Sequence, residues 1–249
     1  ETIVKGSKYD NIDEVEYKDI IWTEDAGTPQ ERVEKVRFVQ NKKGILPIML
    51  EKLWTERKAI KKEMKNVKAR FKEAKTNEEK AALSMQYDVL DGFQLAMKVS
   101  MNRIYGFTGA NLGRLPEKRI AAATTAEGRR MIQACKEYVE SNYDCKVVYG
   151  DTDSIYVKFF TQFTGQEHMN EVFRLSEVAA EGCSQLFKKP VEMEFEKVMW
   201  PFILFSKKRY ACVIWTNEHK HDYIDYKGIQ VVRRDNCPYV KDKSMSSQL

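Results

Sequence analysis

The sequence predicts an α+β fold in which helices alternate with antiparallel hairpins and a long helical hairpin is inserted. Two long helical patterns follow one another between residues 45 and 105. A turn containing glycine and aspartate separates two strand-like runs at 146–160. Beyond residue 190 the chain becomes rich in short runs of β-branched and aromatic residues, which are typical of strands.

Residues 1–44 are a polar lead-in with two candidate strands, around Ile20–Trp22 and Val33–Val39. A heavily charged helix is predicted over about 45–71, because its apolar residues recur at helical spacing. The run Thr76–Glu79 matches a capping box and predicts the start of a second helix. The two helices should be antiparallel, since only a short polar loop joins them.

The glycine-bearing run Gly106–Ala110 should end this second helix. The remaining elements are expected as a helix from about Ile120 to Ser141, the hairpin at 146–160, a helix from Glu167 to Phe187, and strands at Val191–Phe195, Ile203–Phe205, Tyr210–Trp215 and Ile229–Val232. No internal repeat or low-complexity segment interrupts this order.

Composition limits the class of protein. Hydrophobic residues make up 43% and charged residues 32% of the 249 residues, and the net charge of +5 is compatible with a polyanionic partner. The five cysteines form no CxxC pair, so with only three histidines they argue against a zinc site and fit a reducing intracellular compartment. No run approaches the roughly 18 apolar residues of a membrane span. The chain opens at Glu1 without Met and is interpreted as a fragment of a longer protein.

Asp151 and Asp153 lie at the tip of the predicted hairpin, in the run Tyr149-Gly150-Asp151-Thr152-Asp153-Ser154. A rigid hairpin that carries carboxylates at its tip suits hard divalent cations, which prefer oxygen ligands. Aspartate and threonine are also ordinary turn formers, so a plain turn is the alternative interpretation.

The helical hairpin carries two polar rows. Arg57 and Lys61 are four residues apart on the first helix and therefore share a face. Lys98, Asn102 and Tyr105 share a face of the second helix and lead into the glycine-bearing run. Arginine grips a phosphate through two parallel hydrogen bonds and lysine supplies a point charge, so these groups could meet around one anion. A solvated helix face is the alternative.

A basic set with an adjacent aromatic residue suits contacts to a nucleic-acid backbone, and it consists of Lys207, Lys208, Arg209, Tyr210, Lys227 and Gly228. An edge strand protected by lysines is the alternative. An acidic set lies just upstream. Alternation should place Glu192, Glu194 and Glu196 on one face of a strand, where they either face solvent or strengthen a metal pocket.

Taken together, these elements resemble the fingers and palm of a family B DNA polymerase, of the DNA polymerase delta type that includes relatives in large DNA viruses. The matching runs occur in the family's order and cover about residues 40–240. They are Gln94–Ala110, Val148–Ser154, Glu194–Val198, Ser206–Ala211, and Lys227–Gly228 followed by Arg233–Pro238. Several ordered motifs with family-like gaps make this a specific match.

The resemblance implies an antiparallel-sheet palm with helices, an inserted two-helix fingers hairpin and the start of a thumb. On that division, residues 1–44 lead into the palm, 45–112 form the fingers, 113–226 form the palm with the catalytic hairpin, and 227–249 form the palm–thumb junction.

Residue roles follow from the same resemblance. Asp153 resembles the carboxylate that bridges both catalytic metal ions, and Asp151 resembles its less demanding neighbour. Glu194 and Glu196 resemble acidic residues that lie near the metals without binding them. The residues implied to hold the incoming nucleotide are Arg57, Lys61, Lys98, Asn102 and, beside the nascent base pair, Tyr105. The residues implied to contact the primer–template DNA are Lys207, Lys208, Arg209, Tyr210, Lys227 and Gly228.

The implied chemistry is phosphoryl transfer with two Mg²⁺ ions, which adds deoxynucleotides to a primer 3′ end. The implied partners are primer–template DNA, deoxynucleoside triphosphates and, through regions outside this chain, a sliding clamp, with no membrane. The implied location is intracellular, in the nucleus or at a viral replication site.

Two departures from the family's pattern matter. Arg103 stands where the family usually has serine, and it should either point away from the site or alter nucleotide handling. A further metal-binding aspartate is expected from a strand reading Asp-x-x-Ser-Leu-Tyr-Pro-Ser, and no run in this chain resembles it. We therefore expect that carboxylate to lie upstream of Glu1 and the isolated chain to be inactive.

A non-catalytic nucleic-acid-binding module is the competing interpretation. This interpretation does not account for the presence of Asp151, Asp153, Lys98 and Asn102. A protein that had lost catalytic activity would have no physical need to keep these side chains. The palm of a reverse transcriptase or RNA polymerase also carries carboxylates on a hairpin. Such a palm is not expected to combine that hairpin with the helix that holds Lys98 and Tyr105.

Overall fold

The computed structural model describes residues 2–3, 16–110, 116–229, 237 and 239. The chain divides into two compact units, unit 1 over Glu1–Glu127 and unit 2 over Gly128–Leu249. Helices and small antiparallel sheets alternate in both units, which confirms the predicted α+β class.

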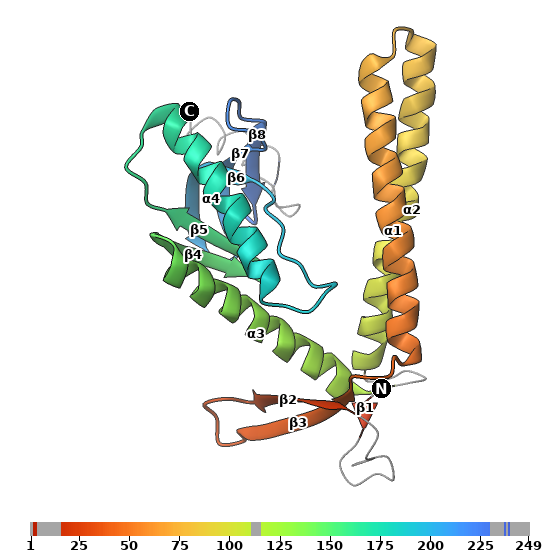
Figure 1. Cartoon of the computed structure of the whole chain (residues 1–249), viewed down its shortest axis with the longest axis vertical. Coiled ribbons are helices and arrows are strands. Elements are labelled where there is room, and N and C mark those ends of the chain that lie inside the picture. The colour runs from red at the N-terminus through yellow and green to blue at the C-terminus, as the bar shows by residue number, and fades with distance from the viewer. Residues whose placement is uncertain (1, 4–15, 111–115, 230–236, 238, 240–249) are drawn as a thin grey trace. The chain divides into compact units, whose positions relative to one another are not determined.

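The helical hairpin of unit 1 consists of α1 (Ile45–Glu73) and α2 (Asn77–Gly109), which run antiparallel (Figure 1). The side chain of Thr76 accepts a hydrogen bond of 3.2 Å from the Glu79 amide, so the predicted helix start is confirmed. The helices are held together by a buried cluster of Val67, Ala74 and Leu83 near the loop.

Helix α2 ends at Gly109, with Ala110 as its C-cap, inside the run Gly106–Ala110 that was predicted to end it. A glycine inside a helix destabilises it by only about 1 kcal/mol, which a long packed helix tolerates. The last turn is fixed by two bonds at Thr108. Its hydroxyl donates to the Tyr105 carbonyl at 2.7 Å, and its carbonyl accepts the Glu117 amide at 2.9 Å.

The other part of unit 1 is a three-stranded sheet of β1 (Thr2–Ile3), β2 (Tyr17–Glu24) and β3 (Arg32–Val39), in the order β1-β3-β2. Both strands that the sequence predicts in this region are confirmed. Trp22 and Val36 are buried against Ala123 and Ala126, which lie near the start of α3 (Lys118–Asn142). This helix begins in unit 1 and continues into unit 2.

Unit 2 is built on a hairpin of β4 (Cys145–Asp151) and β5 (Ser154–Phe159), followed by α4 (Gly165–Gln185). The core contains Cys135 and Val139 from α3, Phe159 from β5, and Ala179 and Cys183 from α4. The two helices therefore cover the hairpin and fix its position within the unit.

A second sheet of unit 2 contains β6 (Val198–Ser206), β7 (Arg209–Trp215) and β8 (Tyr223–Lys227), in that order. One face of β7 is buried and packs on Tyr149 and Tyr156 of the first hairpin. The hydroxyl groups of Tyr156 and Tyr210 lie 3.1 Å apart in this aromatic cluster. The cluster joins the two sheets of the unit.

The predicted strand at Val191–Phe195 is wrong, because residues 191–197 have no regular secondary structure and pair with no described strand. Strand β8 was not predicted, because Asp225 occupies one of its inward positions and breaks the apolar alternation. For the strand expected at Ile229–Val232, Ile229 lies in a bend and the other three residues lie outside the described ones. None of the described helices is both long enough and apolar enough to cross a membrane.

Candidate active site

The acidic hairpin turn has the predicted position. Asp151 pairs with Ser154, so Thr152 and Asp153 form the two-residue tip. Thr152 has a φ of +56°, and the Asp153 amide donates to the Asp151 carbonyl at 2.7 Å. The Ser154 hydroxyl donates to the same carbonyl at 3.0 Å. These bonds turn the chain tightly and place both carboxylates at one end of the hairpin.

The two carboxylates have different surroundings. Asp151 accepts hydrogen bonds from the Lys208 ammonium at 2.6 Å and from the Thr152 hydroxyl at 3.1 Å. The hydrogen bond from Lys208 is the largest cause that holds the pKa of Asp151 below its ordinary value. The carboxylate of Asp153 is exposed and makes no hydrogen bond or ion pair with the described residues. Asp153 is therefore open to a ligand, and Asp151 already has a cation.

Lys208 is held in place by its backbone as well as by its charge. It lies in the two-residue turn between β6 and β7 with a φ of +63°, and its amide donates to the Tyr149 hydroxyl at 2.9 Å. A side chain at Gly228, whose φ is also +63°, would collide with the Lys208 carbonyl oxygen. These contacts direct the Lys208 side chain onto Asp151.

The rest of the predicted DNA-binding set lies around this turn. Lys207 and Arg209 are exposed on either side of Lys208, and Lys227 pairs with Asp225 at 3.2 Å. Tyr210 is only 8% exposed. Its hydroxyl and ring belong to the aromatic cluster beneath the turn, so this residue supports the turn from inside.

Replacement of Lys208 by alanine is expected to raise the pKa of Asp151 toward its ordinary value. A carboxylate whose pKa is lowered in the folded state contributes stability above its unfolded pKa, and that contribution is lost as the pH falls through the folded pKa. Carboxyl titration by NMR in the 249-residue chain measures the shift. Lys207→Ala is the matched control and should move this pKa less, because Lys207 acts only through a weaker coulombic effect. An unchanged Asp151 pKa in Lys208→Ala would contradict the ion pair.

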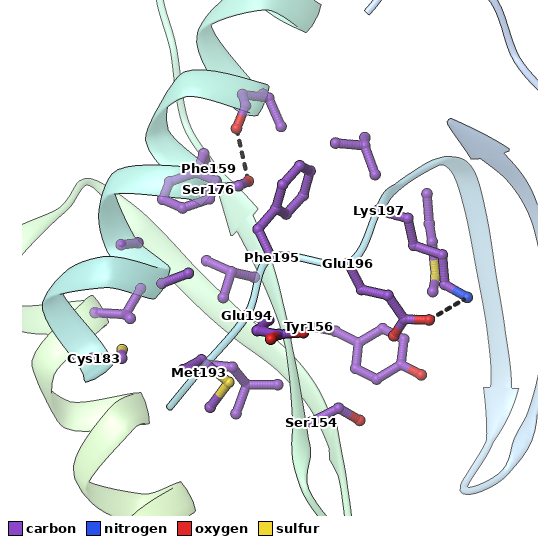
Figure 2. Close-up of a pocket in the computed structure, with 18 of the residues that line it drawn as sticks. Ser154, Tyr156, Phe159, Ser176, Cys183, Met193, Glu194, Phe195, Glu196 and Lys197 are labelled. Carbon is purple, nitrogen blue, oxygen red and sulfur yellow. Dashed lines mark hydrogen bonds and ion pairs between the residues drawn. The ribbon is translucent and has the colours of Figure 1, made fainter. Parts of the chain in front are cut away.

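A cavity of about 540 Å³ lies beside the acidic turn, and Asp153 is among the residues that line it. Glu194 and Glu196 line the same cavity and are labelled in Figure 2. Glu196 pairs with Lys197 at 3.2 Å. The deeper wall is apolar, with residues of α3, β5 and α4. The cavity therefore combines an acidic rim with an apolar floor.

The alternation predicted for the acidic set is confirmed, although the segment is not a strand. Glu192, Glu194 and Glu196 are exposed, whereas Met193 and Phe195 are partly buried. The ring of Phe195 meets that of Phe173 edge to face at 5.4 Å, which anchors the segment to α4.

The chemistry of these oxygen donors suits Mg²⁺, because carboxylates are its preferred protein ligands. The set is incomplete, however. No group of three or more histidine, cysteine, aspartate or glutamate side chains that could hold a metal ion occurs within the described residues. A complete metal site needs at least one more carboxylate beside Asp153.

In unit 1, the polar rows of the helical hairpin meet at Arg57. Its guanidinium donates two hydrogen bonds to Gln94 Oε1, at 3.2 and 3.0 Å, across the helix pair. Gln94 in turn donates to Asp91 at 2.9 Å. Gln94 lies one turn before Lys98 and on the same face, so this contact places Arg57 next to the row that contains Lys98.

The polar side chains of the two rows are spread along the hairpin axis and do not form one compact cluster. We call this set the polar ladder, and it consists of Arg57, Lys61, Lys98, Asn102 and Tyr105. Because Arg57 lies level with Gln94 in an antiparallel pair, Lys61 lies level with about residue 90, or about 12 Å along the axis from Lys98. Lys61, Lys98 and Asn102 are all exposed. The Tyr105 hydroxyl donates to the Ala121 carbonyl at 3.2 Å, which ties the far end of the row to α3.

Arg103 does not share the face of this row. At about 100° per residue, its side chain starts about 100° around α2 from that of Asn102. Arg103 is also exposed. Of the two alternatives for this unusual residue, the geometry favours a side chain that points away from the row.

A family model described as DNA polymerase family B matches residues 1–248 of the chain. The chain belongs to DNA polymerase family B. The DNA polymerase delta catalytic subunit of Schizosaccharomyces pombe is 44% identical over 219 residues, which are 84% of this chain and 18% of that protein. The Arabidopsis thaliana protein of the same name is 46% identical over 208 residues, 80% of this chain and 17% of that protein. The family B chain thus spans less than a fifth of the curated relatives it matches.

A solved structure is also similar, that of the family B DNA polymerase from the archaeon Pyrobaculum calidifontis. It has a TM-score of 0.48 and 24% identity to this family B chain, and the match covers 86% of this chain and 26% of that one.

Two residues help to position the site in this family B chain, and the sequence alone did not identify either of them as functional. In the sequence, Gln94 stands out only as the first residue of the matching run Gln94–Ala110, yet its side-chain oxygen accepts hydrogen bonds from the Arg57 guanidinium. Tyr149 was noticed only as part of a strand, yet it fixes the Lys208 amide. The signal for Gln94 was its position one turn before Lys98. For Tyr149 no local signal exists, because its partner is 59 residues away.

Proposed function

We propose that the chain supplies the fingers and palm of a DNA-directed DNA polymerase, which adds deoxynucleotides to the 3′ end of a primer. The observation that carries this proposal is the acidic turn. One of its carboxylates is already neutralised by Lys208, and the other, Asp153, lies open on an acidic cavity. Membership of DNA polymerase family B supports the same activity.

On this proposal residues 1–44 lead into the palm, 45–112 are the fingers, 113–226 are the palm, and 227–249 begin the thumb. The compact units divide elsewhere, within α3, because Ala123 and Ala126 pack on the sheet of unit 1. Functional regions and packing units need not coincide where one long helix belongs to both.

Asp153 is proposed as the principal Mg²⁺ ligand, with Asp151 in a secondary place. Asp153 and Asp151 would hold such ions, which when bound would supply activation of the primer hydroxyl and neutralisation of the departing pyrophosphate. Asp151 also forms the ion pair that holds the Lys208 side chain beside the turn. Glu194 and Glu196 add negative charge on the wall of the same cavity without serving as ligands.

The further carboxylate is proposed to come from an additional strand that fills the cavity. Among the described residues, β5 pairs with β4 alone, and residues 191–197 belong to no sheet. Both segments line the cavity. A strand inserted there would pair with both and bring its aspartate beside Asp153, and residues 191–197, whose side chains alternate between exposed and partly buried, would gain the strand neighbour that they lack among the described residues.

The ladder on the helical hairpin is proposed to hold the triphosphate. Lys98 and Asn102 are the principal contacts, and Arg57 and Lys61 approach the same phosphates from α1. Tyr105 lies by the nascent base pair, with its hydroxyl fixed by Ala121. Such positioning and charge neutralisation are the main protein contributions to phosphoryl transfer.

The basic turn is proposed to follow the primer–template DNA. Lys207 and Arg209 are exposed and carry the phosphate contacts, which makes binding depend on salt. Lys208 and Lys227 act beside them, Gly228 leaves room for the turn, and Tyr210 supports it from below. A sliding clamp, if one assists, would bind elsewhere in the parent protein, and the reaction would take place where DNA is replicated.

The test compares two proteins in a primer-extension assay. One is the 249-residue chain, and the other is a chimera in which this chain replaces the matching segment of the Schizosaccharomyces pombe DNA polymerase delta catalytic subunit. We expect extension by the chimera and none by the 249-residue chain, because the residues that the structure describes contain no complete metal site. Robust synthesis by the 249-residue chain would contradict the expectation that a further metal-binding carboxylate is required from outside it. A folded chimera that binds primer–template DNA but never extends it would contradict the proposed function.

A further inference from the structure

One flank of helix α1 carries a row of exposed lysines. The row runs along the half of the helix that approaches the loop to α2, and its members follow one another at alternating steps of three and four residues. Residues at these steps share one face of a helix, here within about 80° of one another. The lysine row consists of Lys58, Lys61, Lys65, Lys68 and Lys72.

The charges of the lysine row are not neutralised within the described part of the protein, because none of its side chains makes an ion pair with a described residue. No aspartate or glutamate stands three or four residues from any of these lysines. Each has another lysine at that spacing, and such like-charge pairs destabilise a helix. The other helices differ, since Lys136 pairs with Glu140 at 4.0 Å on α3 and Arg174 with Glu171 at 2.6 Å on α4. An anionic ligand would relieve the repulsion, whereas solubility alone would be served by mixed charges.

The unpaired charge follows a narrow line along the helix. Glu63, Arg70 and Glu73 carry mixed charge on the same half of α1, and they lie about 100° or more around the helix from the centre of the lysine row. From Lys58 to Lys72 the row is about 21 Å long. That length matches about six stacked nucleotides of one strand, at about 3.4 Å for each phosphate. The shape therefore suits a linear polyanion.

An aromatic side chain extends the same row by one turn. Trp54 precedes Lys58 by four residues and is 38% exposed, and the Lys58 ammonium lies 4.9 Å from the centroid of its ring. Proteins that bind unpaired strands combine a line of cations for the phosphates with exposed aromatic rings on which bases stack. The bases of a duplex are stacked inside it and cannot use such a ring. Trp54 therefore favours a single strand over a duplex.

We propose that the lysine row and Trp54 bind single-stranded DNA, with the phosphates along the lysines and a base on the indole ring. Lys61 belongs both to this row and to the polar ladder, so the two surfaces are continuous on one side of the hairpin. Beyond Lys61 the row contacts the strand and not the incoming nucleotide. Binding of the strand requires no metal ion and is independent of the activity proposed above, in which the unpaired template would be such a strand.

The experiment measures the affinity of the 249-residue chain for a fluorescent oligothymidine of about ten nucleotides over a range of salt concentrations. In the double variant Lys68→Gln/Lys72→Gln we expect the affinity at low salt to fall about tenfold or more. The slope of log affinity against log salt should become shallower by about 1.4, because each phosphate contact to a single strand contributes about 0.7. The matched control is Lys52→Gln/Arg70→Gln, which removes the same charge from α1 outside the row and should leave the slope unchanged. Equal losses in the two variants, or an unchanged affinity in the first, would overturn the proposal.

A stacking variant and two competitors identify the class of ligand. Trp54→Leu should weaken binding about fivefold or more and leave the salt slope unchanged, because a stacked base carries no charge in this contact. Blunt duplex DNA and polyglutamate of equal charge should each displace the oligothymidine less well than an unlabelled single strand does. Equal displacement by polyglutamate would assign the lysine row to an acidic protein partner and overturn the proposal. Equal displacement by the duplex, or no effect of Trp54→Leu, would overturn the preference for a single strand.

Discussion

Replacing Asp153 by alanine is expected to lower the rate of primer extension by the chimera about a thousandfold or more. The physical reason is the position of this carboxylate. Asp153 is the carboxylate of the acidic turn that makes no ion pair with the described residues, whereas Asp151 is already paired with Lys208. A metal ligand lost from a site that needs every carboxylate removes several kcal/mol of stabilisation from the transition state. Single-turnover extension, with the rate measured against Mg²⁺ concentration, gives the effect.

Two further variants show whether the effect belongs to Asp153 itself. Asp151→Asn should lower the rate only about tenfold, because Asp151 holds Lys208 more than it holds metal. Glu194→Gln removes a negative charge from the wall of the same cavity and should have the smallest effect of the three. An Asp151→Asn variant that is as inactive as Asp153→Ala would contradict the distinction drawn between the two carboxylates.

Lys98→Ala is expected to lower kcat/KM for the incoming nucleotide about a hundredfold, with little change in the binding of primer–template DNA. Lys98 is exposed on α2, one turn beyond the residue that receives the Arg57 guanidinium. A cation that grips the triphosphate contributes at this step, and DNA contacts lie elsewhere. Steady-state incorporation of one deoxynucleotide, with DNA affinity measured separately, distinguishes the two.

The matched control for this prediction is Lys65→Ala, which removes an exposed lysine from the same helical hairpin, one turn beyond Lys61 and further along the axis from Lys98. Its kcat/KM should stay close to that of the unaltered chimera. Lys98→Arg should recover part of the loss, since the charge remains and only the geometry changes. Equal losses in Lys65→Ala and Lys98→Ala would mean that the hairpin contributes general positive charge and no specific contact.

Local signals were enough to predict much of the fold. The Thr76 capping box marked the start of α2 within one residue, because a cap depends on four neighbouring residues only. The acidic turn was predicted for the same reason, since glycine, aspartate and flanking β-branched residues specify a hairpin by themselves. The alternation of Glu192, Glu194 and Glu196 correctly gave their exposure.

Features that depend on distant parts of the chain were not predictable. The ion pair that distinguishes Asp151 from Asp153 joins residues 57 positions apart. The segment at 191–197 has the pattern of a strand, but a strand also needs a pairing partner, and no described strand pairs with it. The run Gly106–Ala110 correctly marked where α2 ends, although the helix continues past Gly106 to Gly109, because one glycine destabilises a long helix only slightly.

The central claim is that Asp153, through Mg²⁺, and Lys98, through phosphate, serve the same bound nucleotide. The most direct measurement is the affinity of the chimera, in the presence of primer–template DNA, for a non-hydrolysable deoxynucleoside triphosphate with and without Mg²⁺. The account predicts Mg²⁺-dependent binding that is lost in Asp153→Ala and weakened in Lys98→Ala, with the two effects coupled in the double variant. Binding that stays equally tight without Mg²⁺, or that is unaffected by Asp153→Ala, would contradict it.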